Sequence, residues 1–172
     1  YIRDNWVGDP SILTQLLNTL NIDPLTYLDY IPDYFLRQSE IKSIIIPNHI
    51  KSIGRDAFGG CTSLTSVTIP DSVASIGLGA FCECSSLTSI IIPDNVMSIS
   101  DYAFLSCPRL TSVIIPASVT SIGYEAFSSC GMLTQIKYMG TIYQWSKIKL
   151  ERGWNSDSPI ETIHCIDGDI NL

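Results

Sequence analysis

Cysteine and histidine are the residues of this chain best suited to covalent or metal chemistry, and there are six of one and two of the other. Cys82 and Cys84 form a C-x-C pair, but no second pair stands at zinc-ligand spacing. Neighbouring cysteines form disulfides only where their Cα atoms lie within about 7 Å. Free thiols pack as small apolar groups. Four cysteines recur every 23 residues, which favours a buried column of thiols: Cys61, Cys84, Cys107 and Cys130. Cys82 and Cys165 break this pattern and are expected to be more accessible.

The histidines do not complete a catalytic set. His49 and His164 lie near opposite ends of the repeated region, so they cannot share a metal ion. His164 and Cys165 are adjacent in an expected strand, where successive side chains point to opposite faces, so they do not form a nucleophile and base pair. G-x-S-x-G, P-loop and G-x-G-x-x-G motifs are absent from the sequence. We therefore expect no enzyme activity, no cofactor and no metal site.

The cysteine spacing belongs to a longer repeat. The segment S-I-G-R-D-A-F at Ser52–Phe58 returns in related form, without an insertion, at residues 75–81, 98–104 and 121–127. Between two such segments, apolar residues follow the pattern L-x-x-L-x-L at Leu64, Val67 and Ile69. The alternation predicts a strand, which Pro70 should end because proline lacks a backbone N–H. One unit cannot bury its apolar groups alone, so the units must stack.

These units resemble the bacterial leucine-rich repeats of the BspA-like family, which read roughly S-I-G-x-x-A-F-x-x-C-x-x-L-T-x-V-x-I-P. The match covers residues 41–136, and a weaker copy at 31–47 has Ser39 near the cysteine position. The resemblance implies an α/β solenoid, a right-handed superhelix with a concave parallel β-sheet and short helical or 3-10 turns on its convex side. It also implies a secreted or cell-surface bacterial protein that makes adhesive or other protein contacts.

The ends of the repeat region require caps, because an open solenoid exposes core and sheet edge. Residues 1–30 are expected to form an N-terminal helical cap, with Asp9 as the N-cap of a helix over 9–20. Residues 31–138 hold one degenerate and four regular copies. Residues 139–172 form a C-terminal capping unit, in which a short helix with Trp145 packed inward replaces the Phe turn and a strand over 160–165 closes the stack.

Composition narrows the range of partners. Apolar residues make up 45% of the chain and charged residues 16%, with a formal net charge of −7. Nucleic acid is not an expected partner, because phosphate binding needs clustered Lys and Arg, and the sequence has no apolar run long enough for membrane insertion. The chain begins with Tyr1, so any signal peptide is expected to precede it. A monomer is expected, or a weak homodimer formed through an exposed strand edge near residues 160–166.

The candidate binding surface is the solvent-facing side of the repeated strands. One column on it contains a neighbouring pair of isoleucines, and exposed apolar neighbours on a sheet begin a contact patch: Ile45, Thr68, Ile91, Ile114 and Lys137. A second column includes Thr88 and Thr111, for which strand propensity alone is a sufficient explanation. The sequence favours a module that binds a protein of a host or bacterial surface. The alternatives are a structural spacer and a carbohydrate-binding module, although the columns lack the aromatic platforms typical of the latter.

Overall fold

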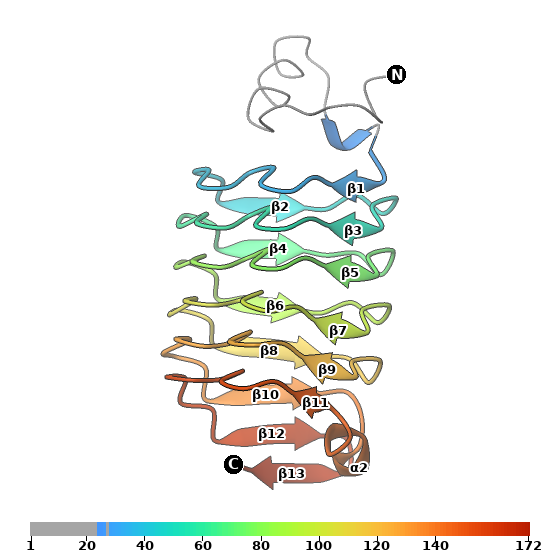
Figure 1. The fold of residues 1–172 in the computed structure, drawn as a ribbon, viewed down its shortest axis with the longest axis vertical. Coiled ribbons are helices and arrows are strands. Elements are labelled where there is room, and N and C mark those ends of the chain that lie inside the picture. The colour runs from blue at the N-terminus through green and yellow to red at the C-terminus, as the bar shows by residue number, and fades with distance from the viewer. Residues whose placement is uncertain (1–23, 27) are drawn as a thin grey trace.

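The computed structural model describes residues 24–26 and 28–172, and in this part the chain winds into a stack of similar coil turns (Figure 1). The helix expected over 9–20 lies outside the described residues. The described part of the expected cap is the 3-10 helix η1 (Pro24–Thr26), in which Leu25 is buried. The solenoid expected from the repeat is therefore present.

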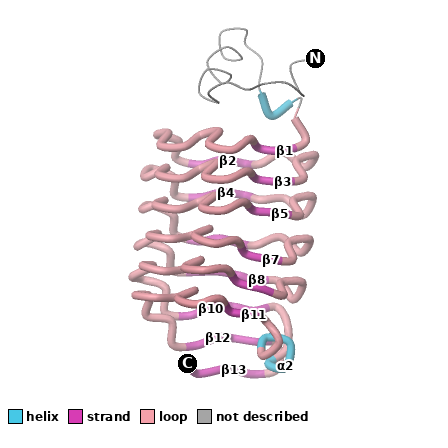
Figure 2. The backbone as a smooth tube through the Cα atoms, viewed as in Figure 1, coloured by secondary structure: helices cyan, strands magenta, loops and turns pink. Residues whose placement is uncertain are grey.

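Short parallel strands line two sides of the stack, and turns and loops make up most of the remaining chain (Figure 2). One side is formed by β2 (Ser43–Ile45), β4 (Ser66–Thr68), β6 (Ser89–Ile91), β8 (Ser112–Ile115), β10 (Gln135–Tyr138) and β12 (Thr162–Cys165). The other side is formed by β1 (Tyr30–Ile31), β3 (Ser52–Ile53), β5 (Ser75–Ile76), β7 (Ser98–Ile99), β9 (Ser121–Ile122) and β11 (Lys149–Leu150).

The register of the strands follows the sequence repeat. Ser43 pairs with Ser66, and Ser89 with Ser112, so each residue lies beside its counterpart 23 positions away. Identical apolar residues consequently form columns through the core. The phenylalanines stack almost in parallel, with ring centroids 5.1 to 5.6 Å apart, along Phe58, Phe81, Phe104 and Phe127. This confirms the predicted stacking.

The four repeated cysteines are buried free thiols. Each thiol donates a hydrogen bond to a backbone carbonyl of the preceding turn, as Cys84 does to Phe58 at 3.2 Å and Cys130 to Phe104 at 3.3 Å. Burial raises the pKa of Cys130 to about 11, and it raises the pKa of Cys107 well above the ordinary thiol range. Cys82 and Cys165 are the partly exposed thiols. The four repeated cysteines therefore pack as small side chains of the core.

The side of the stack opposite the L-x-x-L-x-L strands differs from the prediction of helical or 3-10 turns. Besides the second row of strands, it consists of turns whose backbones hydrogen-bond to the next turn, for example Phe58 N–H to Ala80 O at 2.8 Å. Residues with positive φ recur in these turns, as at Asp56 and Tyr102, and they bend the chain without helix. Lateral hydrogen bonds thus link successive turns on this side as the strand ladders do on the other, and Figure 1 shows the turns stacked one above another.

Position 100 interrupts the stack. The equivalent residue is glycine in three other turns, and a Cβ on Gly77 would lie only 2.6 Å from the carbonyl carbon of Gly54 in the turn before. Ser100 carries a Cβ at this close approach. Within the described turns, no ladder joins β4 to β6 or β5 to β7, and the widest phenylalanine spacing, 5.6 Å, falls at the same junction, between Phe81 and Phe104. The Ser100 hydroxyl donates to the carbonyl of Ile76 at 2.5 Å, whereas the equivalent Gly77 donates its backbone N–H to the carbonyl of Ile53. The side chain of Ser100 thus takes the place of a backbone hydrogen bond at the wider junction between these two turns.

The last turn is built around two tryptophans. The helix α2 (Ile142–Trp145) begins with a capping box between Thr141 and Gln144, and Trp145 is buried against Tyr138 as predicted. The prediction that α2 replaces the Phe turn is wrong. The strand β11 follows α2 and pairs with β9, and Trp154 then packs edge-on against Phe127 with centroids 6.5 Å apart. The polar surroundings of Trp154 in the sequence concealed this role.

The strand edge expected at residues 160–166 is covered. After β12 the chain turns back into β13 (Gly168–Asn171), which pairs antiparallel with β12 through Ile163 and Ile170. Gly168, with φ of 146°, begins the returning strand. The prediction of a homodimer contact through β12 is therefore wrong, because β12 is already paired with β10 on one side and with β13 on the other.

Candidate functional site

The residues of the predicted candidate column are paired in two parts, one on β2 and β4 and one on β6 to β12, with no ladder between Thr68 and Ile91. Ile45 pairs with Thr68, Ile91 with Ile114, and Ile114 with Lys137 in successive strands. Lys137 pairs in turn with His164, which the sequence analysis did not assign to the column. We call the surface that carries these six residues, together with Thr88 and Thr111, the exposed sheet face. It runs along the solvent side of the strands β2 to β12.

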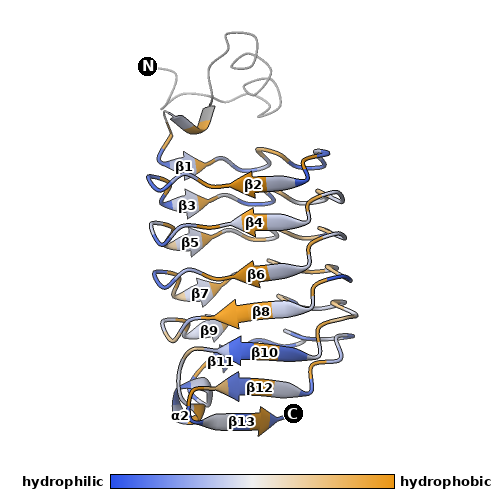
Figure 3. Ribbon diagram, turned by 180° about the vertical axis from the view of Figure 1, so that it is seen from behind, coloured by the Kyte–Doolittle hydropathy of each residue, from blue (hydrophilic) through white to orange (hydrophobic). Residues whose placement is uncertain are grey.

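Isoleucine gives this face its apolar character. Ile45 is 77% exposed and Ile91 is 63% exposed, although isoleucine is among the residue types most often buried. Ile114 is only partly exposed, because Ile91 and Lys137 flank it in the neighbouring strands. Figure 3 shows the apolar strands β6 and β8 next to the hydrophilic strands β10 and β12. The face thus changes from apolar to polar along the stack.

The hydroxyl groups of the threonine column are hydrogen-bonded to backbone carbonyls of the preceding turns. The hydroxyl of Thr88 donates to the carbonyl of Thr65, and that of Thr111 to the carbonyl of Thr88, at 3.3 and 3.1 Å. Their donor hydrogens are therefore already used, and each threonine presents mainly its methyl group and an acceptor oxygen. This arrangement serves the stacking of the turns.

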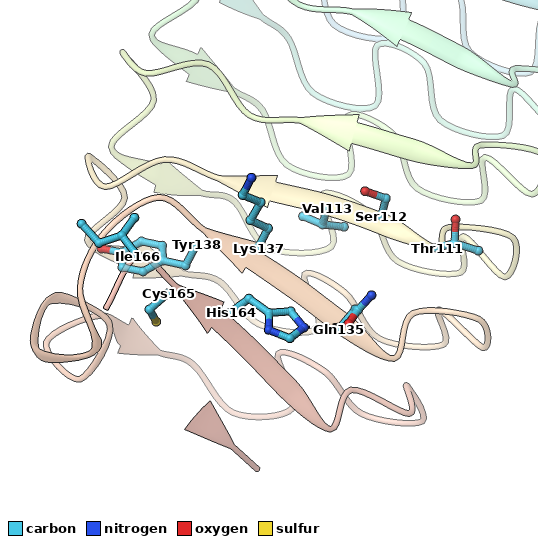
Figure 4. A pocket seen from close by; sticks show the side chains of 9 residues that line it. All are labelled: Thr111, Ser112, Val113, Gln135, Lys137, Tyr138, His164, Cys165 and Ile166. Atoms are coloured by element: carbon cyan, nitrogen blue, oxygen red, sulfur yellow. Dashed lines mark hydrogen bonds between the residues drawn. The ribbon is translucent and has the colours of Figure 1, made fainter. Parts of the chain in front are cut away.

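A depression of about 440 Å³ marks the polar end of the face, over β8, β10 and β12 (Figure 4). Ser112, Gln135, Lys137 and His164 line it. His164 is held in place on both sides, with Nδ1 2.8 Å from Asp169 Oδ1 and Nε2 2.7 Å from Gln135 Oε1. The sequence did not show this arrangement, because Asp169 reaches His164 only through the unpredicted strand β13.

The other groups considered for chemistry remain apart. His49 Nε2 lies 2.6 Å from the carbonyl of Leu25 at the other end of the stack. Cys165 lies beside Tyr138 and has a raised pKa, first because of burial and then because of Asp167 and Asp169. Across residues 24–26 and 28–172, no group of three or more His, Cys, Asp or Glu side chains is arranged to hold a metal ion. In the same part of the chain, no helix is long and apolar enough to span a membrane.

Solved structures of bacterial leucine-rich-repeat proteins have a similar architecture. The chain shares 31% identity with a leucine-rich-repeat protein of T. pallidum, with a TM-score of 0.61, over 63% of this chain and 51% of that one. It shares 38% identity with a leucine-rich cell surface protein of Faecalibacterium prausnitzii, with a TM-score of 0.54, over 68% and 37%. A leucine-rich-repeat protein of Bacteroides ovatus is 25% identical, with a TM-score of 0.56, over 78% and 44%.

The chain spans about half or less of the length of these structures. It matches none of the functionally curated proteins with which it was compared. The sequence profile of the BspA type leucine-rich repeat region matches residues 29–149 in six copies. The match includes the degenerate first copy and extends through α2. The chain therefore belongs to the BspA-type leucine-rich-repeat family.

Proposed function

We propose that this chain is a non-catalytic protein-binding or adhesion module of a secreted or cell-surface bacterial protein, and that its partner contacts the exposed sheet face. The observation that carries the proposal is the exposure of Ile45 and Ile91 on the same side of the stack, in strands whose register with β4 and β8 is regular. Apolar side chains held in fixed rows provide contact area with little loss of conformational entropy on binding. The related F. prausnitzii protein, described as a cell surface protein, supports the location.

A pull-down with matched variants tests this proposal. The purified chain would be used to capture proteins from host matrix preparations and bacterial surface extracts. In the variant Ile91→Thr with Ile114→Thr, the strands keep β-branched residues, and Thr68 already occupies the same column. Met97→Thr is the control, because Met97 is 65% exposed beside β7 on the other sheet.

We expect the double variant to reduce capture of a protein by about ten-fold or more, since each lost methylene contact is worth about 0.8 kcal/mol. The Met97 control should bind as the unmodified chain does. Capture that is equal in all three proteins would contradict binding through this face. Capture of no protein by any of them would favour the structural spacer over the binding module.

A further inference from the structure

The polar end of the exposed sheet face holds hydrogen-bond donors that have no acceptor within the described chain. Lys137 is exposed in the centre of β10, and none of the ion pairs of the described residues includes it. Ser112 lies on the neighbouring strand β8, and no hydrogen bond of its hydroxyl to another described residue is found. Figure 4 shows both side chains on the solvent side of the sheet. A lysine ammonium group and a serine hydroxyl thus border one depression.

His164 holds a third polar side chain of the depression, Gln135. The side-chain amide of Gln135 lies against His164 Nε2, with Oε1 at 2.7 Å. Asp169 is the acidic side chain closest to this cluster in the pairing of the strands, and it is engaged by His164 Nδ1 at 2.8 Å. The histidine therefore both orients Gln135 and occupies the acidic group that would otherwise compete for Lys137.

The neighbouring surface is apolar. Ile114 is directly beside Lys137 in the register, and Ile91 is the next residue of the column. Adjacent strands are about 4.8 Å apart, so Ile91 is about 10 Å from Lys137 along the face. In an extended peptide, side chains two positions apart are separated by about 7 Å on one side. A carboxylate at Lys137 would thus place such a side chain over the Ile91 and Ile114 pair.

Resting on the function proposed above, we propose that this depression is an acidic-peptide subsite. An extended segment of the partner protein presents an Asp or Glu carboxylate to Lys137 and Ser112, and a Val, Ile or Leu two positions away packs on Ile91 and Ile114. Carboxylates bound by a charged donor form stronger hydrogen bonds than neutral acceptors do. The net charge of −7 opposes long polyanions, so a single carboxylate with an aliphatic neighbour fits this surface.

A peptide selection tests the subsite. A phage-displayed library of random heptapeptides would be panned on the immobilised chain, on Lys137→Gln and on Lys42→Gln. Lys42 is exposed at the other end of the sheet, next to β2, so its variant loses the same charge far from the depression. The Ile91→Thr and Ile114→Thr double variant would be panned in parallel. Circular dichroism of each variant would verify the fold.

The unmodified chain should enrich peptides with an acid two positions from an aliphatic residue. Lys137→Gln should lower the affinity of these peptides by about three-fold or more, the effect expected of one partly exposed ion pair, whereas Lys42→Gln should leave it unchanged. A synthetic peptide with Asn in place of the enriched Asp should bind as weakly to the unmodified chain as the parent peptide binds to Lys137→Gln. Its binding should also lose most of its dependence on salt.

Three outcomes would overturn the inference. Enriched peptides that lack an acid but depend on Ile91 and Ile114 would refute the acidic subsite and leave the proposed function standing. Enrichment of no peptide on any protein would count against both. Binding of sialylated glycans on an array, lost in Lys137→Gln and accompanied by no peptide enrichment, would show that the carboxylate comes from an acidic sugar.

Discussion

At the scale of single residues, the repeat turns each core side chain into one member of a column. Phe104 lies between Phe81 and Phe127, and each repeated cysteine donates to the turn before it. These positions were predictable from the sequence, because identical residues at one spacing must stack if the units stack. The two side-chain contacts that hold His164 were not predictable, since its partners Gln135 and Asp169 come from two other strands.

The buried thiol column predicts a dependence of stability on alkaline pH. The pKa of Cys130 is raised by burial to about 11 in the folded chain, against an ordinary value of 9.0. Between these values the folded state holds a proton that the unfolded state has released, so the contribution of Cys130 to stability is complete below pH 9 and is lost as pH rises to 11.

We expect Cys130→Ala to be less stable than the unmodified chain at pH 7, and the difference to shrink by about 1–2 kcal/mol by pH 11. Urea unfolding of both proteins from pH 7 to 11 measures this difference, and the other titrating groups cancel because both proteins share them. A difference that stays constant with pH would mean that Cys130 is not shielded from solvent as the structure shows.

At the scale of elements, strand positions and their pairing followed from the alternation of apolar residues and from the prolines that end each strand. The turns on the opposite side did not follow, because the sequence S-I-G-x-x-A-F is compatible with a helical turn as well as with a non-helical one. The positive φ of Asp56, Tyr102 and Glu125 makes these turns non-helical. The same position is glycine in only one copy, Gly79, so the repeat as a whole gave little signal of positive φ.

Ser100 provides a test of how the turns approach one another. Replacing Ser100 with glycine removes the Cβ that separates its turn from the preceding one, and the strands β5 and β7 should then pair as β3 and β5 do. We expect Ser100→Gly to stabilise the chain by less than about 1 kcal/mol, since the gained backbone hydrogen bonds outweigh both the entropy cost of one glycine and the loss of the bond that the Ser100 hydroxyl donates to Ile76.

Hydrogen exchange measured by mass spectrometry would show this as slower exchange in segments 66–76 and 89–99. The reverse change Gly77→Ser is the matched control, and it should speed exchange at the junction between β3 and β5. If Ser100→Gly left exchange unchanged or faster, the Cβ would not be the cause of the gap.

At the scale of the whole molecule, the sequence predicted a stack with one sheet side facing solvent, and the structure contains it. It did not predict the return of β13 over β12, because that return depends on hydrogen bonds between segments with weak patterns of their own. The residues of the candidate column from Ile45 to Lys137 lie on the solvent side of their strands, and the extension of the column to His164 required the register of β12. The repeat thus predicts which residues form columns on the exposed sheet face, while the last strands of the stack decide where that face is polar.

Site-specific photo-crosslinking tests most directly whether partners contact the exposed sheet face. A photoreactive residue would be placed at Thr68 in one variant and at Ser75 in another, two exposed positions of the same turn on different sheets. After exposure to host matrix and bacterial surface proteins, mass spectrometry would identify the adducts. If partners contact this face, we expect a specific protein adduct at Thr68 that is lost when Ile91 and Ile114 are changed to threonine. A specific adduct at Ser75 with none at Thr68 would contradict it.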